Sequence, residues 1–182
     1  MHRCRWANPN NPLYLRYHDE EWGVSTHEDG RLFEMLILEG FQAGLSWECV
    51  LNKREAFRAA FDGFDPQRVA AYTEADCRRL VADAGIIRHR RKIAAAVKNA
   101  AVFLEIQREF GSFAAYLWGF TDGKTVVEPY TRRTTAPLSD RISADLKKRG
   151  MTFVGSTIIY SYLQAVGVLY AHGEECDLYK EA

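Results

Sequence analysis

The stretch LVADAGIIRHRRK, residues 80–92, decides the fold that the sequence predicts. The residues before Gly85 form the end of one helix, because apolar side chains recur there at helical spacing and glycine then interrupts the pattern. A long alanine-rich helix follows and runs to Phe110. Ile86 and Ile87, in the turn, can insert into the core and hold the two helices at a fixed angle. We therefore expect a helix–turn–helix hairpin here.

The second helix of this hairpin begins with a run of positive charge. The free backbone N–H groups of a helix N-terminus attract anions, and Arg88, Arg90 and Lys92 would add cations beside them. This combination, within a hairpin near residues 74–110, would grip a DNA phosphate without reading sequence. The alternative is an ordinary helical hairpin with a basic surface. No second glycine stands two residues after Gly85, so this segment alone leaves both interpretations open.

Helical patterns continue through most of the chain, so we expect an all-α fold forming a single unit over residues 1–182. Further helices are expected over residues 31–43 and 139–149, and a final apolar helix from about Ser156 to Tyr170. The long irregular stretch is 120–137, and the one possible strand fragment is 124–127.

Composition limits the possible functions. The 182 residues contain 24 basic and 24 acidic side chains, so the net charge is zero and only a local patch could attract nucleic acid. No apolar run approaches the roughly 20 residues that span a membrane, and the N-terminus has no apolar signal segment. Four cysteines without a framework spacing fit a reducing compartment. We expect a cytoplasmic monomer without membrane association.

The segment LEGFQAGLSW, residues 38–47, places a carboxylate inside an apolar helix. A buried glutamate costs several kcal/mol unless it is paired, so Glu39 either serves a binding or catalytic role or caps orphan amides at a helix end. Gly44 and the serine after Leu45 indicate a bend beyond that helix. At this bend Leu45 could wedge into a stack of bases.

Aromatic side chains are dense near the N-terminus, with acidic residues between them. Such rings form core more often than a ligand site, but together with carboxylates they also suit a flat, cationic, stackable ligand. The rings are Trp6, Tyr14, Tyr17 and Trp22.

Two Cys/His pairs stand at opposite ends of the chain, Cys4 with His18 and His172 with Cys176. Two thiolates and two imidazoles would complete a closed tetrahedral zinc site. Only the second pair has a tight spacing, at i and i+4, which puts both side chains on one helical face. The alternative is a surface histidine and unrelated thiols.

Several long motifs, in order over nearly the whole chain, resemble the 3-methyladenine DNA glycosylase I family. They are RCRW at 3–6, YHDEEWG at 17–23, the 38–47 and 83–92 segments, and KKRGMTFVGST at 147–157. The resemblance implies a helix-hairpin-helix glycosylase fold that removes 3-methyladenine from alkylated double-stranded DNA. It also implies one structural zinc ion that joins the terminal segments 1–25 and 156–182.

The resemblance also assigns site residues. The zinc ligands would be Cys4, His18, His172 and Cys176. The base would meet Glu39, Tyr17 and Trp47, with Trp6, Tyr14 and Trp22 in the same region. The expected DNA contacts are Gly44, Leu45, Gly85, Arg88, Arg90 and Lys92.

The expected mechanism follows from the chemistry of the substrate. A base within a duplex must be flipped out, and N3-alkylated adenine is cationic and leaves readily. Glu39 would support base binding while water attacks an oxocarbenium-like sugar. The pocket motifs hold no lysine nucleophile, so hydrolysis without strand cleavage is expected. The competing interpretations are a non-catalytic DNA-binding module and a zinc hydrolase, which would need an open coordination position.

Overall fold

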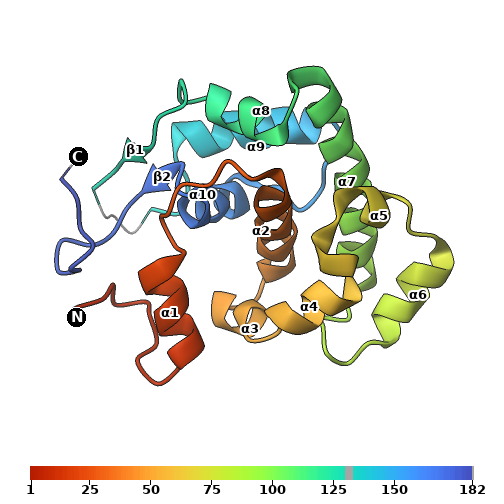
Figure 1. The fold of residues 1–182 in the computed structure, drawn as a ribbon, viewed down its shortest axis with the longest axis horizontal. Coiled ribbons are helices and arrows are strands. Elements are labelled where there is room, and N and C mark those ends of the chain that lie inside the picture. Colours follow the sequence, from red (N-terminus) through yellow and green to blue (C-terminus); the bar gives the residue numbers. More distant parts are fainter. Residues whose placement is uncertain (130–132, 182) are drawn as a thin grey trace.

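A computed structural model describes residues 1–129 and 133–181, and helices dominate both parts (Figure 1). The chain order is α1 (Pro12–Glu20), α2 (Asp29–Gln42), α3 (Trp47–Leu51), α4 (Arg54–Ala60), the 3₁₀ turn η1 (Asp62–Phe64), α5 (Pro66–Ala70), α6 (Glu74–Ala82), α7 (Arg90–Phe110), α8 (Phe113–Gly119), β1 (Val126–Val127), α9 (Pro137–Lys148), α10 (Ser156–Ala165) and β2 (Leu169–Tyr170). No helix in the described ranges is both long and apolar enough to span a membrane.

Helix α2 is the centre of the core. Every residue from Leu32 to Phe41 is buried, because α10, α7, α3 and α8 all pack around it (Figure 1). A helix that is apolar on all sides must be covered on all sides. Any polar group on this segment is therefore held away from water.

The hairpin predicted from residues 80–92 is present as α6, a loop and α7. Ile86 in the loop is buried, and His89 caps α7 by accepting the Lys92 N–H at its Nδ1, 3.3 Å away. Gly85 allows a close approach: a Cβ there would make a tight contact, 3.1 Å from Cβ of Ala56 on α4. The hairpin is thus seated on α4 through this glycine.

The last helix is shorter than predicted. α10 ends at Ala165 instead of near Tyr170, because Gly167 adopts φ +74° and the chain turns into β2. A Cβ on Gly167 would lie 2.3 Å from the backbone nitrogen of Ser25, so only glycine fits this crossing. β2 pairs in parallel with β1, which falls within the predicted 124–127 fragment.

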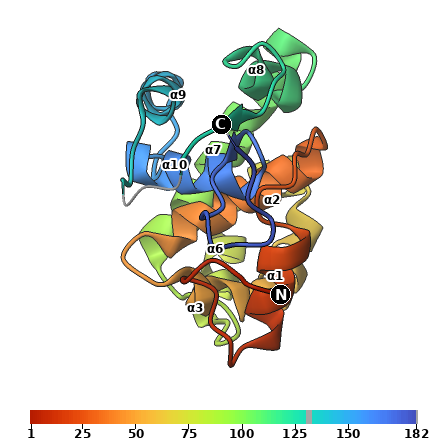
Figure 2. The same cartoon turned by 90° about the vertical axis from the view of Figure 1, so that its left-hand side faces the viewer.

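The two ends of the chain lie on one side of the molecule, the side that faces the viewer in Figure 2. The Asp177 N–H donates to the His2 carbonyl over 3.0 Å, and Arg5 pairs with Glu175. Residues far apart in sequence therefore meet, which makes a shared site between the termini possible.

Candidate active site and metal centre

The carboxyl group of Glu39 is enclosed by α2 and its neighbours. The residue is 3% exposed, and its Oε2 atom is buried without a hydrogen-bond partner. Burial raises the pKa of Glu39 to about 8, so the group is mainly protonated at neutral pH. The alternative that Glu39 caps orphan amides finds no support at Oε2, which accepts no bond.

A cavity of about 220 Å³ opens beside this carboxyl group. Pockets for drug-sized ligands measure roughly 300–1,000 Å³, so this one suits a single small planar molecule. Its lining comes from the N-terminal segment, α1, α2, α3 and α10. The lining residues are Trp6, Tyr14, Tyr17, Trp22, Glu39, Gln42, Trp47, Ser161 and Gln164.

The aromatic walls of the cavity are in mutual contact. Tyr17 on α1 and Trp47 on α3 have ring centroids 5.3 Å apart, and Trp6 lies 5.4 Å from Tyr14 and 4.9 Å from Trp22. These are distances at which aromatic rings attract one another. The structure therefore brings together all six side chains that the sequence assigned to base binding.

Trp47 adds a second unsatisfied polar atom. Its Nε1–H is buried without an acceptor, and both Trp47 and Glu39 line the same cavity. Buried polar groups nearly always have partners, and leaving one unpaired costs about 1–3 kcal/mol. A donor and an acceptor left open together at one cavity indicate a ligand that carries the complementary groups.

A hydrogen-bond network fixes the distance between the α1 and α3 walls. Glu48, next to Trp47, accepts from Nδ2 of Asn8 at 2.9 Å and from Nδ2 of Asn11 at 2.7 Å. Asn11 is also the N-cap of α1, where its Oδ1 accepts from the Leu13 and Tyr14 amides. Burial first, and then the Glu48 charge, raise the pKa of Tyr14 to about 12, so its phenol stays protonated.

A buried ion pair supports the far side of the Tyr17 wall. Arg54 on α4 is 6% exposed and donates to both carboxylate oxygens of Glu21, at 2.7 and 2.8 Å. Arg31 at the start of α2 pairs with the same carboxylate. Tyr17 itself is fully enclosed, and burial raises its pKa well above the usual value.

Three lining residues were missed by sequence reasoning: Gln42, Ser161 and Gln164. Gln42 lies three residues after Glu39, and Ser161 lies three before Gln164, so each pair shares a helix face. A polar side chain repeated at this spacing within an apolar helix was the signal available.

The four predicted metal-ligating residues come together in one buried cluster. Their Nδ1, Nε2 and Sγ atoms all lie within 4.8 Å of one another. The Cys4 Sγ–His172 Nδ1, Cys176 Sγ–His172 Nδ1 and Cys176 Sγ–His18 Nε2 distances are 3.6, 3.4 and 3.6 Å. Zinc bonds of about 2.3 Å to sulfur and about 2.0 Å to nitrogen place such ligands roughly 3.5 Å apart in a tetrahedron. These three sulfur–nitrogen distances therefore match those of a tetrahedral zinc site.

The groups around the cluster orient its imidazoles. Nδ1 of His18 lies 2.8 Å from Oδ1 of Asp19, and Nε2 of His172 lies 3.4 Å from the Trp22 carbonyl, so the opposite nitrogen of each ring faces the thiols. The hydrogen bond from Arg3 is the main cause that lowers the pKa of Asp19 to about 2. Burial lowers the pKa of His172 to about 4, which keeps this imidazole neutral as a ligand must be.

The residues expected to meet DNA fall into two groups. Arg88 and Arg90 are exposed at the start of α7, with Arg90 3.3 Å from Glu74, and Gly44 and Leu45 form an exposed turn after α2. Gly44 has φ +79°, and the Leu45 side chain is 42% exposed. These four residues are accessible to a large partner.

The position of Lys92 differs from the one that the sequence predicted. A mobile surface cation was expected, but Lys92 is only 6% exposed and its Nζ donates to the carbonyls of Phe41 and Ala43 at 2.8 and 2.6 Å. The long side chain folds inward because these carbonyls, at the end of α2, need donors. Lys92 is therefore an internal contact between helices.

Comparisons with known proteins agree with one another. The family model described as methyladenine glycosylase matches residues 6–180. DNA-3-methyladenine glycosylase 1 of Escherichia coli strain K12 is 48% identical over 98% of this chain and 97% of that protein. The DNA-3-methyladenine glycosylase of Haemophilus influenzae is 39% identical over 96% of each chain.

Solved structures give the same result. A crystal structure of 3-methyladenine DNA glycosylase I superposes with a TM-score of 0.93 at 46% identity, over 98% of this chain and all of the other. A crystal structure of a variant of 3-methyladenine DNA glycosylase I in complex with 3-methyladenine has a TM-score of 0.93 at 36% identity, over 100% and 99% of the two chains. The enzyme from Staphylococcus aureus, in a structure concerned with 3-methyladenine recognition, also scores 0.93 at 36% identity, over 99% and 97%.

Proposed function

Because this chain belongs to the methyladenine glycosylase family, we propose that its aromatic cavity receives a 3-methyladenine base turned out of DNA, with Glu39 as the recognition group. The chain is a DNA repair enzyme that excises 3-methyladenine by hydrolysing the N-glycosidic bond. How the base is held and how the reaction proceeds depend on the residues of this chain.

The observation that carries the proposal is the pair of open polar atoms at one cavity. Oε2 of Glu39 can accept, and Nε1–H of Trp47 can donate. An adenine ring carries N–H donors on its amino group and lone pairs on its ring nitrogens, so its edge can meet both. The base would stack on the rings of Tyr17 and Trp47, and a cationic base gains more from such aromatic faces than a neutral one.

The charge state of Glu39 offers a basis for selectivity. An N3-methylated adenine in DNA is cationic, and a nearby cation favours the carboxylate form of Glu39 and lowers its pKa. The methylated base therefore gains a charge pair in a water-poor cavity. Normal adenine is neutral and would leave Glu39 protonated, so it gains less.

The reaction needs little acid assistance because the base leaves as a neutral molecule. Water would attack the sugar as positive charge develops on it, and an ionised Glu39 near the base would lower the energy of that charge. Glu105 and Glu109 on α7 are not expected to take part. Glu105 is exposed, Glu109 pairs with Arg149, and neither lines the cavity.

We assign DNA contact to the exposed turn and the hairpin. α6, its loop and α7 would act as a helix-hairpin-helix element, with Arg88 near a phosphate and the amides at the start of α7 toward the backbone. Leu45 stands on the turn that follows the helix of Glu39, where a wedge could occupy the space left by the flipped base.

We assign the Cys/His cluster to one structural zinc ion. Two thiolates and two imidazoles satisfy a tetrahedral ion completely, so these ligands leave no position for a catalytic water. Trp6 lies 5.1 Å from His18, and Trp22 lies 4.7 Å from His172, ring centroid to ring centroid. A zinc ion bound here would therefore hold the aromatic wall of the cavity in place. A cluster whose four ligands fill the coordination of the ion does not favour a zinc hydrolase.

The test is incubation with methylated duplex DNA and chromatography of the released bases. We expect 3-methyladenine among the released bases. A protein that binds the methylated DNA but releases no 3-methyladenine would be a non-catalytic DNA-binding module instead. Single-turnover excision by Glu39→Gln and Glu39→Ala then tests the assigned residue. Wild-type rates and wild-type binding in both variants would remove Glu39 from the mechanism.

A further inference from the structure

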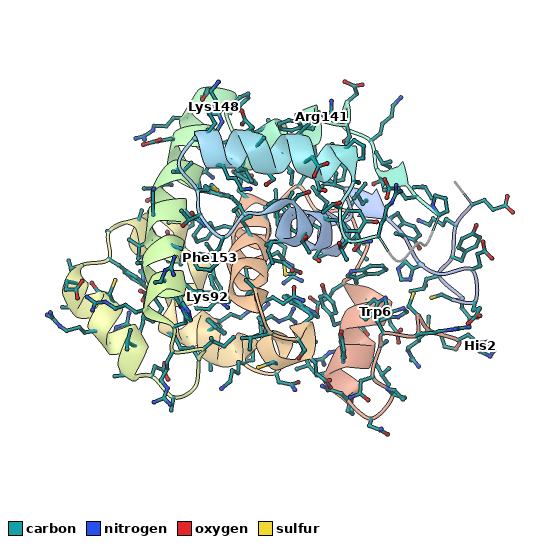
Figure 3. The ribbon with its side chains drawn as sticks, turned by 180° about the vertical axis from the view of Figure 1, so that it is seen from behind. His2, Trp6, Lys92, Arg141, Lys148 and Phe153 are labelled. Carbon is teal, nitrogen blue, oxygen red and sulfur yellow. The ribbon has the colours of Figure 1, made fainter. Side chains whose placement is uncertain are left out.

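Lys92 joins the DNA-facing hairpin to the helix that carries Glu39. It lies in the first turn of α7, and Figure 3 shows it near Phe153, beside α2. Its ammonium group donates to the carbonyls of Phe41 and Ala43, at 2.8 and 2.6 Å. Both bonds cross from one helix to the other, since the partners are about fifty residues apart in sequence.

No basic residue of α2 itself can serve these carbonyls, because the last turn of the helix contains none, and Ala43 leaves the helix with ψ 114°. The last carbonyls of a helix have no partner within it, and the partial negative charge there favours a cation. Lys92 supplies both the donors and the charge from a neighbouring helix.

The same contact sets the path of the chain beyond α2. Gly44 follows at φ +79°, and the Leu45 N–H donates to the Gln42 carbonyl at 2.6 Å, closing a tight turn. The carbonyl of Ala43 therefore lies between the helix of Glu39 and the exposed Leu45. Holding that carbonyl fixes the direction in which Leu45 leaves the protein.

A second contact braces this junction. Asn99 of α7 donates to the Thr152 carbonyl at 2.8 Å and accepts the Thr152 N–H at 2.9 Å. The next residue, Phe153, has φ +55° and packs over Gly40, where a Cβ would lie 3.5 Å from the Phe153 carbonyl oxygen. α7 thus contacts α2 directly through Lys92 and indirectly through the segment that contains Thr152 and Phe153.

We propose that Lys92 is a positioning residue that makes the hairpin and the Glu39–Leu45 segment one rigid unit. When the hairpin rests on DNA, Leu45 is then presented at a fixed place, and the base is turned out opposite Glu39. This inference rests on the proposed function. It concerns the coupling of DNA contact to base extrusion, while the cavity itself is built by other residues.

The test separates these two steps. Binding of free 3-methyladenine, followed by tryptophan fluorescence, reports on the cavity alone, and single-turnover excision from methylated duplex DNA reports on extrusion as well. For Lys92→Met we expect free-base affinity within about twofold of wild type and an excision rate constant lower by about tenfold or more. Lys92→Arg should restore most of the rate, because it keeps the charge and the donors.

The matched control is Lys98→Met, on the exposed side of the same helix, which should excise like wild type. A double-mutant cycle with Leu45→Ala adds a test of mechanism, since two residues acting through one segment give non-additive losses. Should Lys92→Met fail to fold, Lys92→Gln, which keeps two N–H donors on a shorter stem, takes its place.

Either of two results would overturn the inference. One is a wild-type excision rate in Lys92→Met, and the other is an equal loss of free-base binding and excision, which would mean a collapsed cavity. Wild-type protein that releases no 3-methyladenine would refute the proposed function instead, so the two failures are distinct.

Discussion

Nδ2 of Asn11 donates to Oε1 of Glu48 over 2.7 Å, and this bond joins the two helices that carry the neighbouring rings of Tyr17 and Trp47 in the cavity wall. Asn11 precedes α1, which carries Tyr14 and Tyr17, and Glu48 follows Trp47 on α3. The position of these two rings therefore depends on a polar contact outside the cavity. A planar ligand is sensitive to that position, because stacking needs a ring face at van der Waals distance.

Asn11→Ser keeps the helix cap but removes the Nδ2 bonds to Glu48 and to Asn52. Serine caps a helix about as well as asparagine, so the unfolding free energy should fall by less than about 1 kcal/mol. Serine cannot reach Glu48, so the two ring-bearing helices are joined less firmly and free 3-methyladenine should bind about tenfold more weakly by fluorescence titration. Asn10→Ser, at an exposed neighbouring position, is the control. Unchanged affinity in Asn11→Ser would show that other contacts hold the rings in place.

Glu39 should make stability depend on pH. Its pKa is about 8 in the folded protein and near 4.5 when unfolded, so the folded state binds the extra proton between these values. Stability from this group is complete below about pH 4.5 and is lost as pH rises through 8. Glu39→Gln cannot ionise, so its unfolding free energy relative to wild type should rise over this range, by at most about 5 kcal/mol.

Chemical denaturation at a series of pH values measures this difference. Glu105→Gln, at an exposed position on α7, controls for the loss of one carboxylate. A constant difference between Glu39→Gln and wild type from pH 5 to pH 9 would mean that folding does not raise the pKa of Glu39.

Loss of one cluster ligand should affect stability more than chemistry. Cys176→Ser removes a thiolate from the proposed zinc site, so we expect lower zinc content by elemental analysis and a melting temperature lower by about 5 °C or more. The intrinsic excision rate at low temperature should change less. Cys77→Ser, a half-buried thiol on α6 outside the cluster, is the control. Full zinc retention by Cys176→Ser would count against the proposed zinc site.

Excision should proceed without a covalent bond to the enzyme. Strand-cleaving glycosylases need an amine that attacks the sugar, but no lysine among the described residues lines the cavity and the Lys92 ammonium is held by two carbonyls. Borohydride added during turnover should therefore trap no protein–DNA adduct on a denaturing gel. A trapped adduct would show that a lysine can reach the sugar, and its loss in Lys92→Met would identify which one.

The sequence predicted the helical class and singled out most residues of the candidate site, because both depend on local or unusual features. Apolar spacing and capping residues indicated the helices. The carboxylate within residues 38–47 stood out against its apolar neighbours. The density of aromatic residues near the N-terminus could be recognised without knowledge of any tertiary contact. The four Cys/His residues proposed as zinc ligands were singled out by residue type and by family resemblance. Their spacing along the chain left open whether they form a metal site.

Only the tertiary structure decided where the long side chains go. Lys92 belongs to a basic run and reads as a surface cation, yet two carbonyls at the end of α2 draw it inside. α10 stops at Ala165 because Gly167 crosses Ser25, a contact between segments more than a hundred residues apart. The partners of Glu48 and Arg54 are likewise distant in sequence. A sequence pattern records the preferences of single residues and near neighbours, whereas the pairing of a charge or the end of a helix depends on which distant atoms lie within a few ångströms.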